Sequence, residues 1–156
     1  MVDVNMKRME YPTMQNSDCI FCKIASGKVP AKIILENKST MALLDAFPLA
    51  AGHTLVIPRS HYAKLQDMER LDAVALFEMT WQVASAVEAG SQTSATTIAV
   101  HNGREAGQEI PHVHVHIIPR KPGDGAGPVH SMFGKRPKLG SEEMESLRSK
   151  IAANLK

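Results

Sequence analysis

The sequence predicts an α+β fold with a mostly antiparallel β-sheet. Short β-type segments lie on both sides of one long helical segment, residues 68–89, and outnumber the helical segments. The last two β-type segments are separated by the loop NGREAGQEIP, which is typical of an antiparallel pair with a functional loop. The chain has 156 residues, of which 44% are apolar and 22% charged, so it can form one globular domain with a sizeable core.

The first half of the chain predicts a short helix followed by three strands. Residues 18–26 are expected to form the helix, because Asp18 can cap its first turn and Gly27 can end it. Each of the three segments after it is short, β-type and bounded by turn residues. These strands are expected over residues 31–35, 40–45 and 53–58.

The long helix is expected over residues 68–89, with Asp67 as its N-cap and Gly90 at its end. Its apolar residues recur with the helical period, so they predict one buried stripe. The stripe consists of Leu76, Thr80, Val83 and Val87, with Phe77, Trp81 and Ala84 beside it. Trp81 and the methionines of this helix are assigned to core packing.

The second half predicts two more strands and a C-terminal helix. The strands are expected over residues 95–101 and over the run PHVHVHIIPR, and the loose Gly/Pro-rich run PGDGAGP follows them. Ser141 can cap a helix over residues 141–155. We therefore expect a flexible N-terminal arm over residues 1–17, a folded domain over 18–122 and a C-terminal extension over 123–156.

Three histidines at alternate positions, His112, His114 and His116, are the main functional signal. Successive side chains on a strand point to opposite faces, so the three imidazoles share one face while the apolar residues between them point into a core. Packing gives no reason for three histidines in register. Imidazole can act as a base, an acid, a nucleophile or a metal ligand near neutral pH, so this histidine row predicts a functional site.

The only two cysteines, Cys19 and Cys22, have the C-x-x-C spacing of a metal site or a redox pair. With His61 and one histidine of the row they would form a Cys2His2 set, the usual shell of a structural zinc. A catalytic zinc on the three row histidines is the weaker alternative, because side chains at alternate positions of a flat strand diverge. A redox pair is also disfavoured, because the break at Gly27 and Pro30 comes too soon for a thioredoxin-like helix.

The histidine row can also catalyse substitution at phosphorus. A neutral imidazole nitrogen can attack phosphorus if the other ring nitrogen holds its proton on a fixed acceptor. A neighbouring histidine can protonate the leaving group. The loop with Gly103, Gly107 and Gln108 can donate N–H groups to a phosphate, whereas no Walker-type loop is present.

The chain resembles the histidine triad family in three blocks. The family motif, His-φ-His-φ-His-φ-φ with φ apolar, is matched at every position by residues 112–118. The upstream runs CIFCKI and LLDAFPLAAGHTLVIPRSH resemble the other two blocks and stand in the family order. The resemblance covers residues 18–120. It implies a five-stranded antiparallel sheet with one long helix and a short N-terminal helix, usually in a homodimer built around the long helix and a sheet edge.

The resemblance also implies a hydrolase or transferase that acts at the α-phosphate of a purine nucleotide. By this likeness His114 is the nucleophile, His116 lies by the scissile phosphate, and His112 orients its neighbour or binds zinc. His53 corresponds to the histidine that supports the site from the adjacent strand. The zinc ligands implied by the family are Cys19, Cys22, His61 and His112.

The resemblance assigns the substrate contacts to Asp45, His101, Asn102, Gly107 and Gln108. Asp45 lies where the family places a side chain on the ribose hydroxyls, a role that suits a carboxylate. Two residues depart from the family pattern. His101 stands at an Asn or Gln position, and Glu109 stands where relatives carry a Ser or Thr that donates to phosphate, which an ionised carboxylate cannot do.

Charge and hydropathy disfavour other partner classes. A net charge of +2 is too small to indicate a nucleic-acid partner. No apolar run approaches the roughly 18 residues that cross a membrane, and no secretory signal is visible. We expect a cytoplasmic hydrolase of nucleoside phosphoramidates or adenylylated substrates. A dinucleoside polyphosphate hydrolase, a catalytically weak nucleotide-binding module suggested by Glu109, and a metal or redox sensor are the alternatives.

Overall fold

The computed structural model describes residues 14–155, so most of the expected N-terminal arm lies outside the described residues. The chain divides into two compact units, Met1–Pro122 and Gly123–Lys156. The histidine row, the cysteine pair and the loop between the last two strands all belong to the first unit.

The first unit is built on a five-stranded antiparallel sheet with the strand order β1-β2-β3-β5-β4. The strands are β1 (Ile33–Glu36), β2 (Thr40–Leu44), β3 (Thr54–Pro58), β4 (Ala95–Ala99) and β5 (Val115–Arg120). The predicted α+β class and antiparallel sheet are confirmed, with strand ends shifted by a few residues. Strand β5, which carries the end of the histidine row, lies between β3 and β4 and is fixed from both sides.

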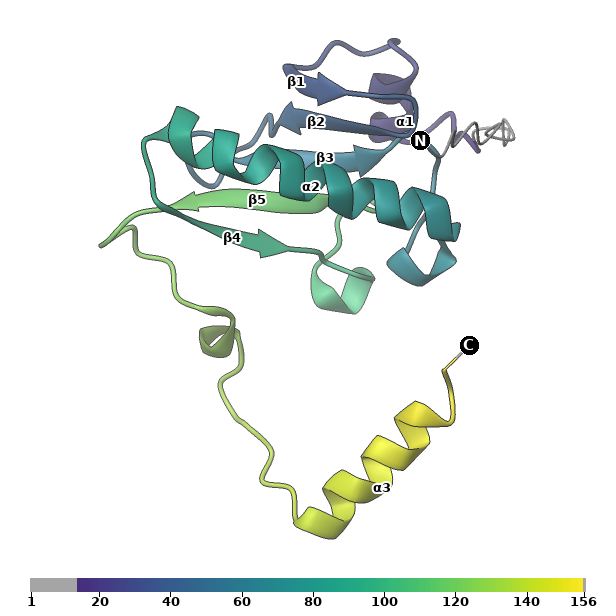
Figure 1. Cartoon of the computed structure of the whole chain (residues 1–156), viewed down its shortest axis with the longest axis vertical. Helices are drawn as coiled ribbons and strands as arrows, with labels where there is room; N and C mark the ends of the chain where they lie inside the picture. Colours follow the sequence, from purple (N-terminus) through teal and green to yellow (C-terminus); the bar gives the residue numbers. More distant parts are fainter. Residues whose placement is uncertain (1–13, 156) are drawn as a thin grey trace, which may run out of the picture. The chain divides into compact units, whose positions relative to one another are not determined.

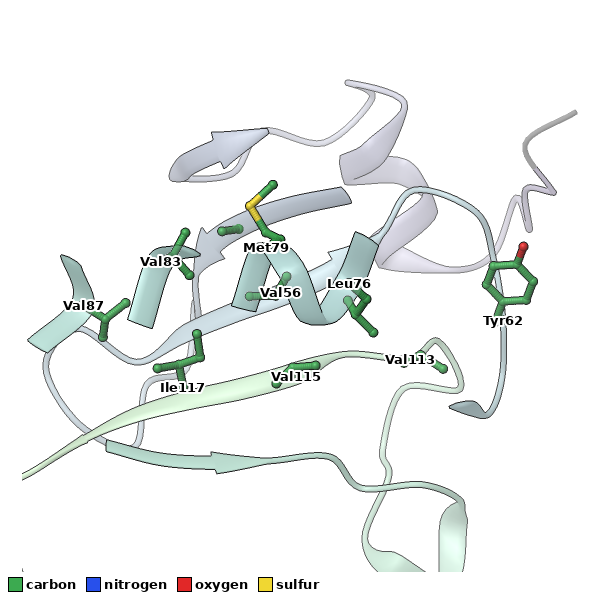
Figure 2. Close-up of a cluster of buried hydrophobic side chains, with 10 residues drawn as sticks. Val56, Tyr62, Leu76, Met79, Val83, Val87, Val113, Val115 and Ile117 are labelled. Atoms are coloured by element: carbon green, nitrogen blue, oxygen red, sulfur yellow. The ribbon is translucent and has the colours of Figure 1, made fainter. Parts of the chain in front are cut away.

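The long helix α2 (Arg70–Ser91) covers one face of the sheet (Figure 1). Figure 2 shows Leu76, Met79, Val83 and Val87 of this helix above Val56, Val113, Val115 and Ile117. Every second residue around the start of β5, namely Val113, Val115 and Ile117, packs into this core. The alternate residues, which are the histidines, therefore face the other side of the sheet.

A short helix, α1 (Ile20–Ala25), packs on that other side of the sheet. Its Phe21 and Cys22 join a second buried cluster with Met41, Leu43, Leu55 and Ile57 of β2 and β3. Because Ala42 and Val56 face α2 instead, strands β2 and β3 are buried on both faces. This packing brings α1 and its cysteines to the side of the sheet that carries the histidines.

The predicted start of the long helix is wrong. Glu69 is the N-cap residue and the helix begins at Arg70. Asp67 belongs to a preceding 3-10 turn, where its Oδ2 accepts the Lys64 backbone N–H at 3.2 Å. Because this carboxylate closes its own turn, it is not available to cap the helix.

The predicted end of the long helix and the predicted cap of the short one are also wrong. The long helix continues past Gly90, and Gln92 then takes the left-handed conformation that ends it, with φ of 53°. A single glycine lowers helix stability but does not stop a helix. In the short helix Cys19 is the N-cap residue, and Asp18 makes no capping hydrogen bond.

The prediction that Trp81 packs in the core is wrong, whereas Met79 is buried as expected. Trp81 is 80% exposed and lies on a line of exposed apolar side chains along α2. This line, called here the outer ridge, consists of Leu71, Val74, Phe77 and Trp81. The helix is apolar on more than one side, so its period alone does not identify the stripe that faces the sheet.

The second unit contains the helix α3 (Ser141–Ala152) after a short 3-10 turn, Val129–Met132. Gly140, not Ser141, is the N-cap residue, and the helix ends before the predicted residue 155. Within residues 14–155 no helix is long and apolar enough to cross a membrane.

Candidate active site and metal centre

The histidine row is not a regular strand at its start. His116 lies in β5, whereas His112 and His114 belong to the segment that precedes it. Between them the backbone N–H of Val113 donates to the carbonyl of Tyr62, outside the sheet, at 2.8 Å. The side chains still alternate between the core and the opposite face, so the three histidines point to the same side of the sheet. The predicted strand begins too early.

His114 has one ring nitrogen engaged and one available. Its Nδ1 lies 2.8 Å from the carbonyl oxygen of His112, and because a carbonyl only accepts, Nδ1 carries the proton. Nε2 therefore presents a lone pair. Burial lowers the pKa of His114, and the nearby imidazole of His101 lowers it further, so the ring is neutral near neutral pH.

His116 lies beside His114, with ring centroids 4.8 Å apart. Its Nδ1 is hydrogen-bonded to Nε2 of His53 at 2.9 Å. Its Nε2 is buried and has no hydrogen-bond partner among the described residues. Burial, together with the neighbouring imidazoles of His114, His53 and His101, lowers the pKa of His116 to about 4. A neutral imidazole with an unused nitrogen thus lies next to the lone pair of His114.

Asp45 and His53 connect this cluster to the turn between β2 and β3. The Asp45 N–H donates to the His53 carbonyl at 2.9 Å, and Asp45 Oδ1 accepts the Phe47 N–H at 2.9 Å. Asp45 Oδ2 lies 3.5 Å from Nδ1 of His53. The carboxylate is half-buried, and its remaining lone pairs can accept from the hydroxyls of a ligand.

Asn102 and Gln108 use their side chains to hold the loop between β4 and β5. Asn102 Oδ1 accepts the Leu65 N–H at 2.8 Å. Gln108 Oε1 accepts the Gly103 N–H at 2.9 Å, and its Nε2 donates to the Ala63 carbonyl at 2.8 Å. Both residues were predicted to contact the substrate, but their side chains hold the loop and are engaged by the fold.

His101 and Gly107 lie close together in the same loop. The His101 ring is half-buried and lies 5.3 Å from the ring of His116, between centroids. Gly107 has φ of 91°, and a Cβ added to it would lie 3.9 Å from His101 Nδ1. Glu109 is exposed to solvent. The half-exposed His101 is therefore the loop side chain best placed to meet a ligand bound at the histidine row.

Four predicted metal ligands come together from three separate segments. The ligand atoms of Cys19, Cys22, His61 and His112 all lie within 4.8 Å of one another. Cys19 Sγ is 3.4 Å from His112 Nδ1, and Cys22 Sγ is 3.4 Å from His61 Nδ1. A tetrahedral zinc with Zn–S of about 2.3 Å and Zn–N of about 2.1 Å separates sulfur from nitrogen by about 3.6 Å. The sulfur–nitrogen separations therefore match those of a tetrahedral metal site.

The surroundings of these donors also suit a metal. Nε2 of His112 donates to the Pro58 carbonyl at 2.9 Å, which leaves Nδ1 as the free ligand nitrogen. The Asn16 N–H lies 3.4 Å from Cys22 Sγ and can stabilise a thiolate. Burial raises the pKa of the Cys22 thiol, so the sulfur needs a bound cation to hold it as a thiolate near neutral pH.

Phe21 and Pro58 were not predicted from the sequence. The Phe21 ring lies 5.1 Å from the ring of His114 and 5.6 Å from that of His112, between centroids. It therefore packs against both the candidate nucleophile and the candidate metal ligand. Its position between the two cysteines is a signal that could have identified it. The Pro58 contact is made by its backbone carbonyl, which every residue has, so the residue type at position 58 does not predict it.

Comparison with known proteins agrees with this geometry. The family model of the HIT domain matches residues 26–123. A HIT-like protein of Methanocaldococcus jannaschii is 43% identical over 110 residues, which are 69% of this chain and 82% of that protein. The adenylylsulfatase HINT3 of Arabidopsis thaliana is 37% identical over 117 residues, which are 75% of this chain but only 59% of the plant protein.

Solved structures share the fold. The crystal structure of a HIT family member from Bacillus subtilis has a TM-score of 0.79 and 32% identity, over 89% of this chain and 98% of that one. A zinc-bound histidine triad family protein from Mycobacterium smegmatis has a TM-score of 0.65 and 31% identity, over 87% and 94% of the two chains. Sequence, fold and histidine row agree, and the chain belongs to the histidine triad (HIT) family.

Proposed function

We propose that the protein hydrolyses nucleoside phosphoramidates or adenylylated substrates at the α-phosphate. The observation that carries this proposal is the state of His114. Its Nδ1–H is fixed on the carbonyl of His112, and its Nε2 lone pair lies within a buried cluster of imidazoles. A neutral, rigidly oriented imidazole of this kind is a nucleophile suited to phosphorus.

In the first step Nε2 of His114 bonds to the α-phosphorus as the bond from phosphorus to the leaving group breaks. The hydrogen bond from Nδ1 to the His112 carbonyl stabilises the positive charge that the ring acquires. A sulfate or phosphate leaves without a proton, whereas an amine needs one. The half-exposed His101 is the histidine that can collect a proton from solvent and deliver it.

In the second step water attacks the phosphorus of the intermediate, and the bond from phosphorus to His114 breaks. The bonding pair returns to Nε2 of His114, and the water proton is released to solvent. Asp45 binds the ribose hydroxyls of the nucleotide. The backbone N–H groups of Ala106, Gly107 and Gln108 already donate to the carbonyls of Gly103 and Arg104, so the side chain of His101 is the loop group that meets the phosphate. Asn102 and Gln108 contribute indirectly, because their side chains keep this loop in place. The base is a purine, in line with the family resemblance.

We also propose that Cys19, Cys22, His61 and His112 hold a structural zinc. The tetrahedral donor spacing supports it, and so does the zinc in the mycobacterial relative. Bound zinc would cross-link α1 to the segment before β5 and supply no reacting group. The ring of His112 then belongs to the metal centre, while its carbonyl orients the nucleophile.

A homodimer is the assembly that we propose, with the outer ridge of α2 and the edge strand β4 as its interface. The ridge places four large apolar side chains in solvent. Strand β4 is one of the two edge strands of the sheet, and its Ile98 is exposed. Exposed apolar surface next to an unpaired strand edge is typical of a protein interface.

A second candidate function is a nucleotide-binding module with negligible turnover. The loop between β4 and β5 favours it, because Asn102 and Gln108 are engaged in the fold and Glu109 cannot donate to a phosphate. Dinucleoside polyphosphate hydrolysis is the enzymatic alternative. The plant relative is an adenylylsulfatase, which supports an adenylylated substrate instead.

Turnover assays with adenosine phosphosulfate, adenosine phosphoramidate and diadenosine polyphosphates test the proposal. We expect His114→Ala to lower kcat by at least about a thousandfold on the preferred substrate. Quenching the wild-type reaction in alkali, where a phosphorus–imidazole bond survives, should show a nucleotide mass on the peptide that carries His114. If the wild type turns over no faster than His114→Ala on any of these compounds but binds adenosine monophosphate, the hydrolase proposal is wrong and the binding module stands.

A further inference from the structure

The turn that joins β2 to β3 is tied to the histidine cluster through a backbone amide. The Leu49 N–H donates to Nδ1 of His53 at 3.1 Å. The turn is closed by two backbone bonds of 2.9 Å, from Asp45 N–H to the His53 carbonyl and from His53 N–H to the Ala50 carbonyl. The Leu49 side chain is 76% exposed, so the residue contributes to the cluster only through its main chain.

This amide fixes where the proton of His53 lies. A backbone N–H always donates, so Nδ1 of His53 must be the acceptor, and the proton of the neutral ring lies on Nε2. That Nε2 is 2.9 Å from Nδ1 of His116, which must then accept. The proton of His116 is thereby placed on its own Nε2, which is buried and has no partner among the described residues.

Asp45 is the competitor for the same nitrogen. Its Oδ2 lies 3.5 Å from Nδ1 of His53 and could accept a proton from it. That arrangement would reverse the whole chain of hydrogen bonds and leave Nε2 of His116 without a proton. The contact from the Leu49 N–H is shorter, and the Phe47 N–H already donates to Asp45 Oδ1 at 2.9 Å. The Asp45 carboxylate therefore does not accept a proton from Nδ1 of His53.

We propose that the Leu49 backbone amide is a positioning group that sets the tautomers of His53 and His116 and so keeps Nε2 of His116 as a hydrogen-bond donor. The role of that donor rests on the proposed function: it would meet a phosphoryl or bridging oxygen of the substrate beside His114. The turn therefore selects between a donor and an acceptor at the reacting centre without touching the substrate itself.

Nitrogen NMR of the ligand-free, full-length protein, labelled at histidine and held above neutral pH, tests the tautomers directly. We expect His53 and His116 both to carry the proton on Nε2 and to show the unprotonated shift at Nδ1. A proton on Nδ1 of either ring in the wild type overturns the proposal. This readout needs no turnover, so it separates failure of the inference from failure of the proposed hydrolase.

Two variants at position 49 then isolate the amide. Leu49→Pro removes the N–H, whereas Leu49→Ala removes the side chain and keeps the N–H. We expect Leu49→Ala to keep the wild-type tautomers and Leu49→Pro to move the His53 proton to Nδ1, facing Asp45. Wild-type tautomers in a folded Leu49→Pro protein would overturn the proposal, and so would a shifted tautomer in Leu49→Ala.

A double variant and the kinetics complete the test. In the Leu49→Pro background, Asp45→Ala removes the competing carboxylate and should return the His53 proton to Nε2. A persistent proton on Nδ1 would contradict the proposed competition. On a substrate that the wild type turns over, Leu49→Pro should lower kcat at least about tenfold while KM changes less than about twofold, because the lost donor acts in the transition state.

Discussion

His112 contacts the proposed metal centre with its ring and the proposed nucleophile, His114, with its backbone carbonyl. Its Nδ1 lies 3.4 Å from Cys19 Sγ, while its carbonyl oxygen accepts Nδ1–H of His114 at 2.8 Å. The two centres are therefore joined by a single residue. A shift of the metal ligands would move the His112 carbonyl and so change the orientation of the His114 ring. This relationship predicts that the cysteine pair affects the proposed activity although it lies outside the proposed reacting centre.

Removal of the metal should lower stability and then activity. We expect about one zinc per chain in the purified protein, and a chelator should lower the free energy of unfolding by about 3–4 kcal/mol relative to saturating zinc. The Cys22→Ser variant should show neither the zinc nor the chelator effect. Metal analysis and urea unfolding with and without chelator measure both. A wild-type protein without zinc, or one whose unfolding ignores the chelator, would contradict the metal centre.

Substitution of His101 should affect substrates according to their leaving group. His101→Ala removes a donor near a charged phosphate and should raise KM about tenfold for every substrate. If His101 also delivers a proton, kcat should fall further for a phosphoramidate than for a phosphosulfate. His101→Asn, which keeps a hydrogen-bond donor but removes the imidazole, should recover KM but not the kcat for the amine leaving group. If the kinetics of His101→Ala equal those of the wild type, His101 does not contact the substrate.

Stability should fall as the pH falls through the range set by His116. Its folded-state pKa is lowered to about 4, below the value of about 6.5 in an unfolded chain. Between these values the unfolded state binds more protons than the folded state, so the free energy of unfolding decreases as the pH drops from about 6.5 to about 4. His116→Asn should reduce this decrease by on the order of 1–2 kcal/mol, after allowance for partial exposure. Urea unfolding at several pH values measures it, and equal slopes in both proteins would contradict the assignment.

The sheet and the convergence of the four candidate metal ligands could be predicted because residue type and spacing report on them. Alternation in the histidine row reports which residues enter the core, since Val113, Val115 and Ile117 all do. Cys19 and Cys22 are rare residue types at a metal spacing, so they indicate ligands before the fold is known. The family blocks then supply the partners that are distant in sequence.

Backbone contacts could not be predicted in the same way. The Leu49 amide and the Pro58 carbonyl act on His53 and His112 through groups that every such residue carries. Asn102 looks like a ligand-binding residue in the sequence, but its amide is used by the Leu65 N–H. These roles depend on which distant segments come into contact in the fold, and that contact cannot be predicted from residue types.

The outer ridge of α2 leads to a prediction about assembly. Trp81 is 80% exposed at the end of the outer ridge and is the largest side chain of that ridge, so it can contact a second copy of the chain. Aromatic residues at the centre of an interface commonly contribute 2 kcal/mol or more, and a glutamate there would also carry its charge out of water. We therefore expect Trp81→Glu to raise the dimer dissociation constant by at least about thirtyfold.

Analytical ultracentrifugation over a range of concentrations measures this shift, with Gln82→Glu as the matched control. Gln82 is also exposed, lies one position along the same helix and takes the same charge, but it is outside the ridge. The control should sediment like the wild type, while Trp81→Glu should become monomeric with its helical circular dichroism unchanged. A wild-type protein that is monomeric at all concentrations, or a Trp81→Glu dimer as tight as the control, would mean that the ridge is not the interface between copies of this chain.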